Sequence, residues 1–309
     1  MTRRISFHDQ ISRNKWKSTL LLISILAVLL ILGYIIGMAL GPDYFTFIMI
    51  IATIISIFYI WAGYYNSHKI ALASVKAKPA TSSTYPQYNH IVEGLCLASG
   101  MPKPKLYVME DPQINAFASG RDPKNAVICV TTGCLEKLDK HELEGVLAHE
   151  LSHIANYDIR FMTLTAVLVG MIAIISQIFL RSLFWQSFSG GGGGNKDNKM
   201  QIIFIVIGIV LAILAPIVVS LVQLAISRKR EYTADASAVK FIRSPTGLIN
   251  ALEKINSEHP SKNEQRDEKH RINKAIAPLF ISDPFKRKID SFFATHPPIN
   301  KRIDILKRM

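Results

Sequence analysis

His149-Glu150-Leu151-Ser152-His153 places two histidines four residues apart, with a glutamate directly after the first. On a helix, residues four apart share a face, so both imidazoles can reach one metal ion. Glu150 lies one step round the helix, where its carboxylate can take a proton from water at that ion. The stretch therefore predicts the metal site of a zinc hydrolase, with Glu150 as general base.

The residues around this stretch favour a helix. Neither Gly nor Pro interrupts the chain between positions 146 and 154. Apolar side chains recur at three- and four-residue spacing, at Leu143, Val146, Leu147, Leu151 and Ile154. A buried helix whose histidines are satisfied by hydrogen bonds would show the same periodicity. The paired histidines with the intervening glutamate favour the metal site.

A catalytic zinc site usually has three protein ligands and leaves the fourth position for water. The search for a third ligand leads to Arg230-Glu231-Tyr232-Thr233-Ala234-Asp235, directly after a long apolar segment. Glu231 and Asp235 are four residues apart and share a helical face. Glu231 could bind the metal, and Asp235 could hydrogen-bond the second nitrogen of a ligand histidine. A solvated acidic helix face is the alternative for this pair.

The composition indicates a membrane protein. The chain is 49% hydrophobic and yet carries a net charge of +13, so apolar and basic residues must be segregated along it. The segments 18–40, 44–65, 161–184 and 201–226 each reach the ~20 apolar residues that a bilayer requires. The first is too long for a signal-peptide core, so we expect an anchor. Buried helices of a soluble protein are a weak alternative for four such segments.

The distribution of positive charge sets the expected orientation, because basic residues favour the cytoplasmic side. They precede the first segment and follow the second and the fourth, at Arg3, Arg4, Arg13, Lys15, Lys17, Lys69, Lys76, Lys78, Arg228, Lys229 and Arg230. Both termini and the segment 66–160 should therefore be cytoplasmic. Two crossings separate His153 from Glu231, so both ligands would emerge on the same face of the membrane.

This topology predicts a multi-pass α-helical membrane protein with a cytoplasmic α+β catalytic domain. Residues 1–65 would form a first transmembrane hairpin and 161–226 a second. Residues 66–160 and 227–309 would together form the domain, which carries the paired histidines in its first part and Glu231 in its second. We expect a small mixed sheet packed on the helix that carries His149 and His153. Its strands are expected at 105–109 and 126–130, with further helices at 88–99, 135–138 and 300–306.

Two further stretches are candidates for a role in the site. Asn115-Ala116-Phe117-Ala118 lies between the expected strands, and its small side chains would let an extended peptide approach a sheet edge. An ordinary strand explains the same residues, and the residues alone favour it. His296-Pro297-Pro298 holds an imidazole before a rigid turn, where it could stabilise an oxyanion. A surface turn that starts the final helix explains it equally well.

Other features narrow the chemistry. Cys96, Cys129 and Cys134 are odd in number on a reducing side, so we expect free thiols. The positive flanks of the apolar segments and attraction to anionic lipids account for the basic excess. No nucleic-acid motif is present. The expected partners are therefore polypeptide substrates and the lipid bilayer, and not nucleic acid.

The chain resembles the HtpX-type membrane zinc metalloproteases in four motifs, HELSH (149–153), EYTAD (231–235), NAFA (115–118) and HPP (296–298). The resemblance extends from the N-terminal hairpin to the closing stretches LFISDPF and THPPINKRI. It implies a zincin-like domain and one Zn²⁺ per chain, with three ligands, His149, His153 and Glu231. It further implies that Glu150 is the general base and that Asp235 supports a ligand histidine by a hydrogen bond.

The resemblance also implies that residues 115–118 form the substrate-binding strand and that His296 assists near the metal. These enzymes are associated with stress response and with quality control of membrane proteins in prokaryotes. That implies a zinc endopeptidase in the cytoplasmic membrane that cuts damaged proteins on the cytoplasmic side. Related prenyl-protein proteases share the metal motifs but have more spans, and four spans argue against that version.

Two other functions are open to the sequence. A non-catalytic membrane protein with a structural or regulatory zinc site would need four protein ligands, and His296 is the obvious candidate for the fourth. A membrane transporter is poorly supported, because the four apolar segments carry almost no ionisable residues.

Overall fold

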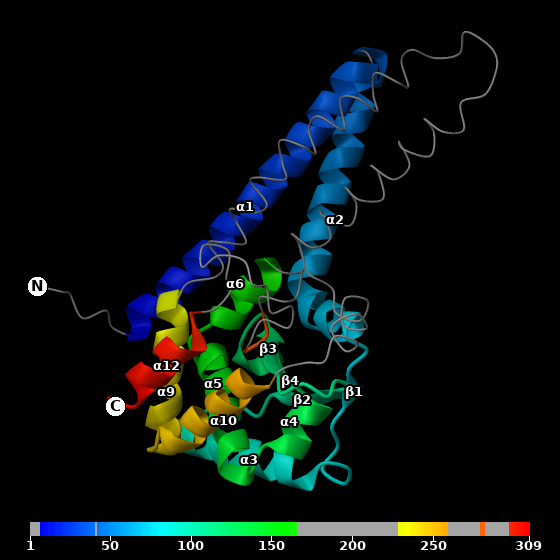
Figure 1. Ribbon diagram of the computed structural model, residues 1–309. Helices are drawn as coiled ribbons and strands as arrows, with labels where there is room; N and C mark the ends of the chain where they lie inside the picture. Colours follow the sequence, from blue (N-terminus) through cyan, green and yellow to red (C-terminus); the bar gives the residue numbers. More distant parts are fainter. Residues whose placement is uncertain (1–6, 41, 166–227, 259–278, 282–296) are drawn as a thin grey trace, which may run out of the picture.

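The computed structural model describes residues 7–40, 42–165, 228–258, 279–281 and 297–309 (Figure 1). The predicted segment 201–226, most of the segment 161–184 and His296 lie outside these described residues.

Two long helices project from the rest of the molecule as an antiparallel hairpin (Figure 1), α1 (Phe7–Leu40) and α2 (Pro42–Ser74). Both are long and apolar enough to cross a membrane, and few residues in their apolar stretches are buried. In the described part of the chain, all the exposed large hydrophobic side chains except Leu97 and Met309 belong to these two helices. Such an apolar surface is typical of contact with lipid or with a partner.

A four-stranded mixed sheet forms the centre of the remaining part. Its strands are β1 (Lys78–Pro79), β2 (Lys105–Met109), β3 (Ala116–Gly120) and β4 (Ala126–Thr131), in the order β1-β2-β4-β3. The central pair β2 and β4 is parallel, and the two outer pairs are antiparallel. The predicted strands at 105–109 and 126–130 are thus confirmed, and residues 116–118 belong to the edge strand β3.

Alternate side chains of β2, β3 and β4 enter two different cores, as the period of a strand requires. In β4, Ile128 and Val130 join the larger core, which also contains side chains from α3 (Pro86–Ser99), α5 (Lys140–Ala155) and α10 (Thr246–Ser257). Cys129 of the same strand joins a smaller core with Leu72, at the end of α2. The long hairpin is thereby fixed to the sheet on the face opposite α5.

The helix α5 packs against β3, α9 and α10 and carries the paired histidines. Its N-terminus is closed by a capping box, in which the Asp139 carboxylate accepts from the N3 backbone and the Glu142 side chain accepts from the Asp139 N–H. Glu142 is buried and also accepts a bond of 2.6 Å from Lys254 Nζ of α10. The start of α5, and hence the register of the histidines, is therefore well defined.

Four shorter helices and one 3₁₀ turn complete the described structure. They are η1 (Pro123–Asn125), α4 (Thr132–Lys137), α6 (Asp158–Leu164), α9 (Arg228–Ile242) and α12 (Ile299–Leu306). α9 and α10 both lie against α5, and α12 contacts α9 and α10. The three cysteines are free, as the sequence predicts, and all three are buried.

Gly145 permits a close approach of α5 and α10. A Cβ added at Gly145 would lie 2.7 Å from the Leu248 Cα and also against its backbone nitrogen. Gly145→Ala must therefore push α10 away, and we expect it to destabilise the protein by about 3 kcal/mol, the upper end for overpacking. The midpoint of thermal unfolding of the detergent-purified protein measures this.

Gly94 provides the matched control, since it lies within α3 and a Cβ added there would meet nothing within 4 Å. Gly94→Ala should raise the unfolding midpoint slightly. Alanine reduces the conformational entropy of the unfolded chain, which stabilises the folded protein by about 0.5–1 kcal/mol. Equal midpoints for Gly145→Ala and the wild type would contradict the close contact.

Candidate metal centre

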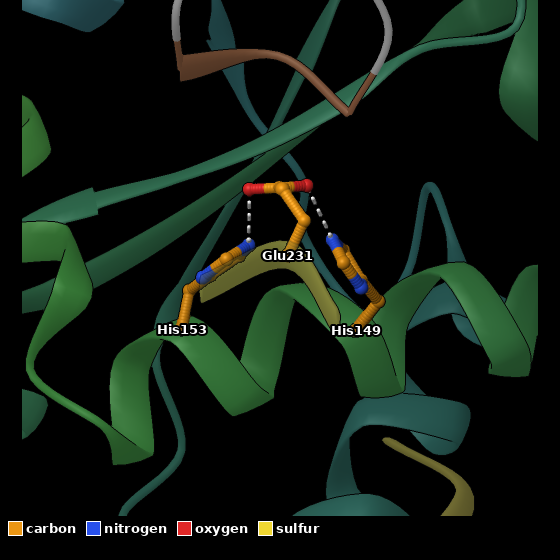
Figure 2. Close-up of side chains that lie close together, drawn as sticks. All are labelled: His149, His153 and Glu231. Atoms are coloured by element: carbon orange, nitrogen blue, oxygen red, sulfur yellow. Dashed lines mark ion pairs between the residues drawn. The ribbon is translucent and has the colours of Figure 1, made fainter. Parts of the chain in front are cut away.

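Three side chains from two helices converge beside the sheet (Figure 2), His149 and His153 of α5 and Glu231 of α9. His149 Nε2 lies 3.7 Å from Glu231 Oε2, and His153 Nε2 lies 3.6 Å from Glu231 Oε1. All three residues are buried. The structure thus brings together the three residues that the sequence predicts as metal ligands, although 77 residues separate His153 from Glu231 along the chain.

The donor set fits a zinc ion. One ligand atom from each of the three residues lies within 4.8 Å of the other two. Two ligand atoms bound to zinc at about 2.0–2.2 Å can be no more than about 4.4 Å apart. The two histidine–glutamate contacts, each to a different oxygen of Glu231, are within that limit. Two imidazoles and one carboxylate are also a known ligand set of catalytic zinc sites. Within the described residues no other cluster of this kind occurs.

Asp235 contacts His149 on the side of the imidazole that faces away from Glu231. Its Oδ1 lies 2.9 Å from His149 Nδ1, which leaves Nε2 directed at Glu231. A carboxylate on the second nitrogen fixes the tautomer and the orientation of a ligand histidine. Asp235, one helical turn after Glu231, therefore lies where it can orient His149.

Asp158 stands in the same relation to the second histidine and was not predicted. Its Oδ2 lies 3.2 Å from His153 Nδ1, and the carboxylate is fully buried. α5 ends at Ala155, and the following turn, in which Tyr157 has a φ of 58°, directs Asp158 back to the site. The available signal was an acidic residue five positions after the second histidine of the motif.

Arg302 of α12 is the other residue that sequence analysis missed. It is fully buried and donates from Nε and Nη2 to the two oxygens of Asp235, over 3.0 and 2.7 Å. Its Nη1 lies 3.8 Å from Glu231 Oε2. The signal was an arginine on the apolar face of the last helix, where Ile299, Ile303 and Leu306 share its side.

The charges of this cluster stabilise one another. Burial alone would raise the pKa of Asp235, but Arg302 and the bond with His149 outweigh it and lower the pKa to about 2. Burial acts to lower the pKa of Arg302, but Asp235 outweighs it and raises that pKa. Asp235 is therefore an anion and Arg302 a cation at neutral pH, as a paired buried charge must be.

Glu150 is almost completely buried beside the two histidines. Burial raises its pKa, while the nearby His149 and His153 act in the opposite direction, and the Ala118 backbone N–H of β3 donates to its carboxylate. A raised pKa brings a carboxylate closer to the working pH of a general base.

The predicted substrate-binding residues 116–118 lie in β3, an edge strand of the sheet. The side chains of Ala116 and Ala118 are buried in the larger core, and α5 packs against β3. Phe117 forms a bridge with Phe280, and Ile281 N donates to Ala116 O over 2.9 Å. The small alanines thus admit α5, and residues 280–281 already occupy part of the strand's outer edge. Asn115 is buried at the start of the strand.

Comparisons with known proteins agree on one family. Residues 82–309 match the family described as Peptidase family M48. A protease HtpX homolog from Caldanaerobacter subterraneus subsp. tengcongensis is 47% identical over 262 residues, 84% of each chain. The protease HtpX homolog from Thermoanaerobacter pseudethanolicus is 42% identical and covers 100% of this chain and 99% of its own. One from Streptococcus pyogenes is 39% identical over 98% and 99%.

A solved structure, the crystal structure of S. mikatae Ste24p, aligns with 96% of this chain at a TM-score of 0.47 and 21% identity. The chain spans 66% of that protein's length. The match to the family model and the HtpX homologs confirm the resemblance that the motifs indicated: the chain belongs to peptidase family M48 and, like its HtpX relatives, is a metalloprotease.

Proposed function

We propose that this protein is a zinc-dependent endopeptidase of the prokaryotic cytoplasmic membrane that cuts damaged or misfolded membrane proteins on the cytoplasmic side. The observation that carries the proposal is the convergence of His149, His153 and Glu231 within 4.8 Å, with Glu150 beside them. Membership of family M48 supports the peptidase chemistry.

His149, His153 and Glu231 would hold the metal in this scheme. A zinc ion held there would supply a Lewis acid that polarises the scissile carbonyl and makes water more acidic. Glu150 would accept a proton from the attacking water and return it to the leaving amine. Asp235 and Asp158 keep the two imidazoles oriented by their Nδ1 atoms. His296, near the start of α12, would help to stabilise the oxyanion.

The substrate would be an extended polypeptide bound along β3 through residues 115–118. The Ala118 N–H donates to the Glu150 carboxylate, so β3 runs beside the general base. An edge strand binds a peptide by backbone hydrogen bonds. The bridge from Phe117 to Phe280 means that such a peptide would have to replace residues 280–281 or bind beyond them.

Glu231→Ala should remove both metal and activity, because two imidazoles alone hold zinc weakly. Zinc content and casein cleavage of the detergent-purified variant, measured beside the wild type, test this. Glu144→Ala, which removes a partly exposed carboxylate of α5 that lies 3.9 Å from His141, is the control and should leave both unchanged. Full zinc content in Glu231→Ala would remove Glu231 from the ligand set.

The same measurement separates the enzyme from a protein with structural zinc. Zinc in the wild type without cleavage of casein or of a membrane substrate would favour the structural site. His296→Ala distinguishes them further, because loss of zinc would make His296 a fourth ligand and close the site. Retained zinc with slower cleavage is the expected result.

The proposed topology places both termini and the metal centre in the cytoplasm, with four spans at 18–40, 44–65, 161–184 and 201–226. The apolar surfaces of α1 and α2 and the basic residues at their ends support this arrangement. Leu97 of α3 is 86% exposed, whereas the native cysteines are buried. Leu97→Cys should therefore react with a membrane-impermeant maleimide in inverted vesicles and not in right-side-out vesicles. The reverse pattern would place the domain outside the cytoplasm.

A further inference from the structure

A buried asparagine lies at the start of the apolar stretch of α1. Asn14 is 3% exposed, and it lies on the same helical stripe as Ser18, Leu21 and Ile25, which are also buried. Leu21 and Ile25 pack against Phe161 and Leu164 of α6. A buried amide on this stripe must find hydrogen-bond partners, because an unpaired buried polar group is costly.

Asn14 finds its partners in the turn that follows the motif helix. Its Nδ2 donates to Asp158 Oδ1 over 2.7 Å and to the Asn156 carbonyl oxygen over 3.0 Å. Both partners are pure acceptors, so the amide has only one orientation that satisfies them. Both N–H groups of the amide are thereby used.

The second oxygen of the same carboxylate faces the metal centre. Asp158 Oδ2 lies 3.2 Å from His153 Nδ1, while His153 Nε2 is directed at Glu231. A continuous path of polar contacts therefore runs from Asn14 through Asp158 to the imidazole ring of His153, one of the proposed metal ligands. Arg230, next to Glu231, is close enough to Asp158 for their charges to interact, but it approaches from α9 and not from the hairpin.

We propose that Asn14 is a positioning residue of the metal centre, which lets the first membrane helix fix the orientation of Asp158 and hence of His153. The proposal rests on the proposed function, because it takes His153 as a zinc ligand. α1 is then part of the catalytic apparatus and more than an anchor. A shift of α1 against α6 moves the amide away from Asp158 and loosens one ligand without touching the others.

The test is the zinc affinity of the full-length protein in detergent, measured by competition with a chelating dye. Asn14→Leu keeps the branching of the side chain at Cγ and removes both donors. Residues behind metal ligands typically contribute 10–100-fold to affinity, so we expect a loss of about tenfold, the lower end of that range. The control is Ser18→Ala on the same buried stripe, whose Oγ bonds only to the Asn14 carbonyl of its own helix. It should bind zinc like the wild type.

A double-mutant cycle makes the test independent of packing. Asn14→Asp is nearly isosteric and puts a second carboxylate against Asp158, so its loss of affinity should exceed that of Asn14→Leu. Adding Asp158→Asn restores a donor–acceptor pair between positions 14 and 158, and part of the affinity should return. Such non-additivity is the mark of residues in direct contact.

Two outcomes would overturn the role of Asn14. One is equal zinc affinity in wild type and in Asn14→Leu protein that unfolds at the same temperature. The other, which decides the matter if Asn14→Leu fails to fold, is a double variant that binds zinc no better than Asn14→Asp. Absence of zinc from the wild type itself is a different result, since it would overturn the proposed metal centre together with this inference.

Discussion

Glu150→Gln should abolish peptide cleavage while the protein keeps its zinc. The glutamine has the same shape and its oxygen can still accept from the Ala118 N–H, but it has no carboxylate to take a proton. General-base catalysis typically contributes about 10²–10⁴-fold, so cleavage of casein should fall by at least about 100-fold. Zinc content should match the wild type, because Glu150 is not among the three residues that meet at the metal centre.

The same substitution has an expected effect on stability. Burial raises the pKa of Glu150, so in protein stripped of metal the native state binds its proton more tightly than the unfolded state does. Stability from this group is complete below the unfolded pKa and is lost as the pH rises through the folded pKa. Glutamine has no charge to desolvate, so Glu150→Gln should raise the unfolding temperature of chelator-treated protein at neutral pH.

Retained cleavage of casein by the pure Glu150→Gln protein would exclude Glu150 as the general base.

The local part of the site follows from short-range rules. Helical periodicity places His149 and His153 on one face of α5, and the four-residue spacing does the same for Glu231 and Asp235 on α9. Strand propensity located β2 and β4, since both are apolar runs bounded by turn residues. The topological argument then added that the two helices share one side of the membrane, which is consistent with their contact in the structure.

The remainder depends on contacts between segments that are far apart in the chain. Asn14 and Asp158 are 144 residues apart, and Arg302 and Asp235 are 67 apart, so no periodicity connects them. The turn after α5 depends on a non-glycine residue with positive φ, Tyr157, for which the sequence has no signal. The contact of residues 280–281 with the outer edge of β3 could not be predicted for the same reason, because these residues come from a distant part of the chain.

Arg302→Met should be the most destabilising single change among the buried charges at the site. Methionine fills a similar volume but leaves the Asp235 carboxylate, which is 1% exposed, without the two bonds that Arg302 donates. Breaking a buried ion pair by removing one partner costs about 3–5 kcal/mol. The unfolding temperature should therefore fall on the order of 10 °C for a domain of this size. Zinc affinity should fall as well, because Asp235 orients His149.

Three comparisons separate the pair from its surroundings. Lys307→Met, at the C-cap of α12, breaks an exposed ion pair with Glu253, in which the two charged atoms are 3.0 Å apart. Exposed pairs contribute at most about 1 kcal/mol, so this substitution should change neither the unfolding temperature nor the zinc affinity. Arg302→Lys keeps the charge but loses the two-pronged geometry, and should be intermediate. Adding Asp235→Asn to Arg302→Met removes the unpaired charge, so stability should partly return while zinc affinity stays low. If the unfolding temperature and the zinc affinity of the double variant recovered together, Arg302 would act on the metal centre only through the stability of the fold.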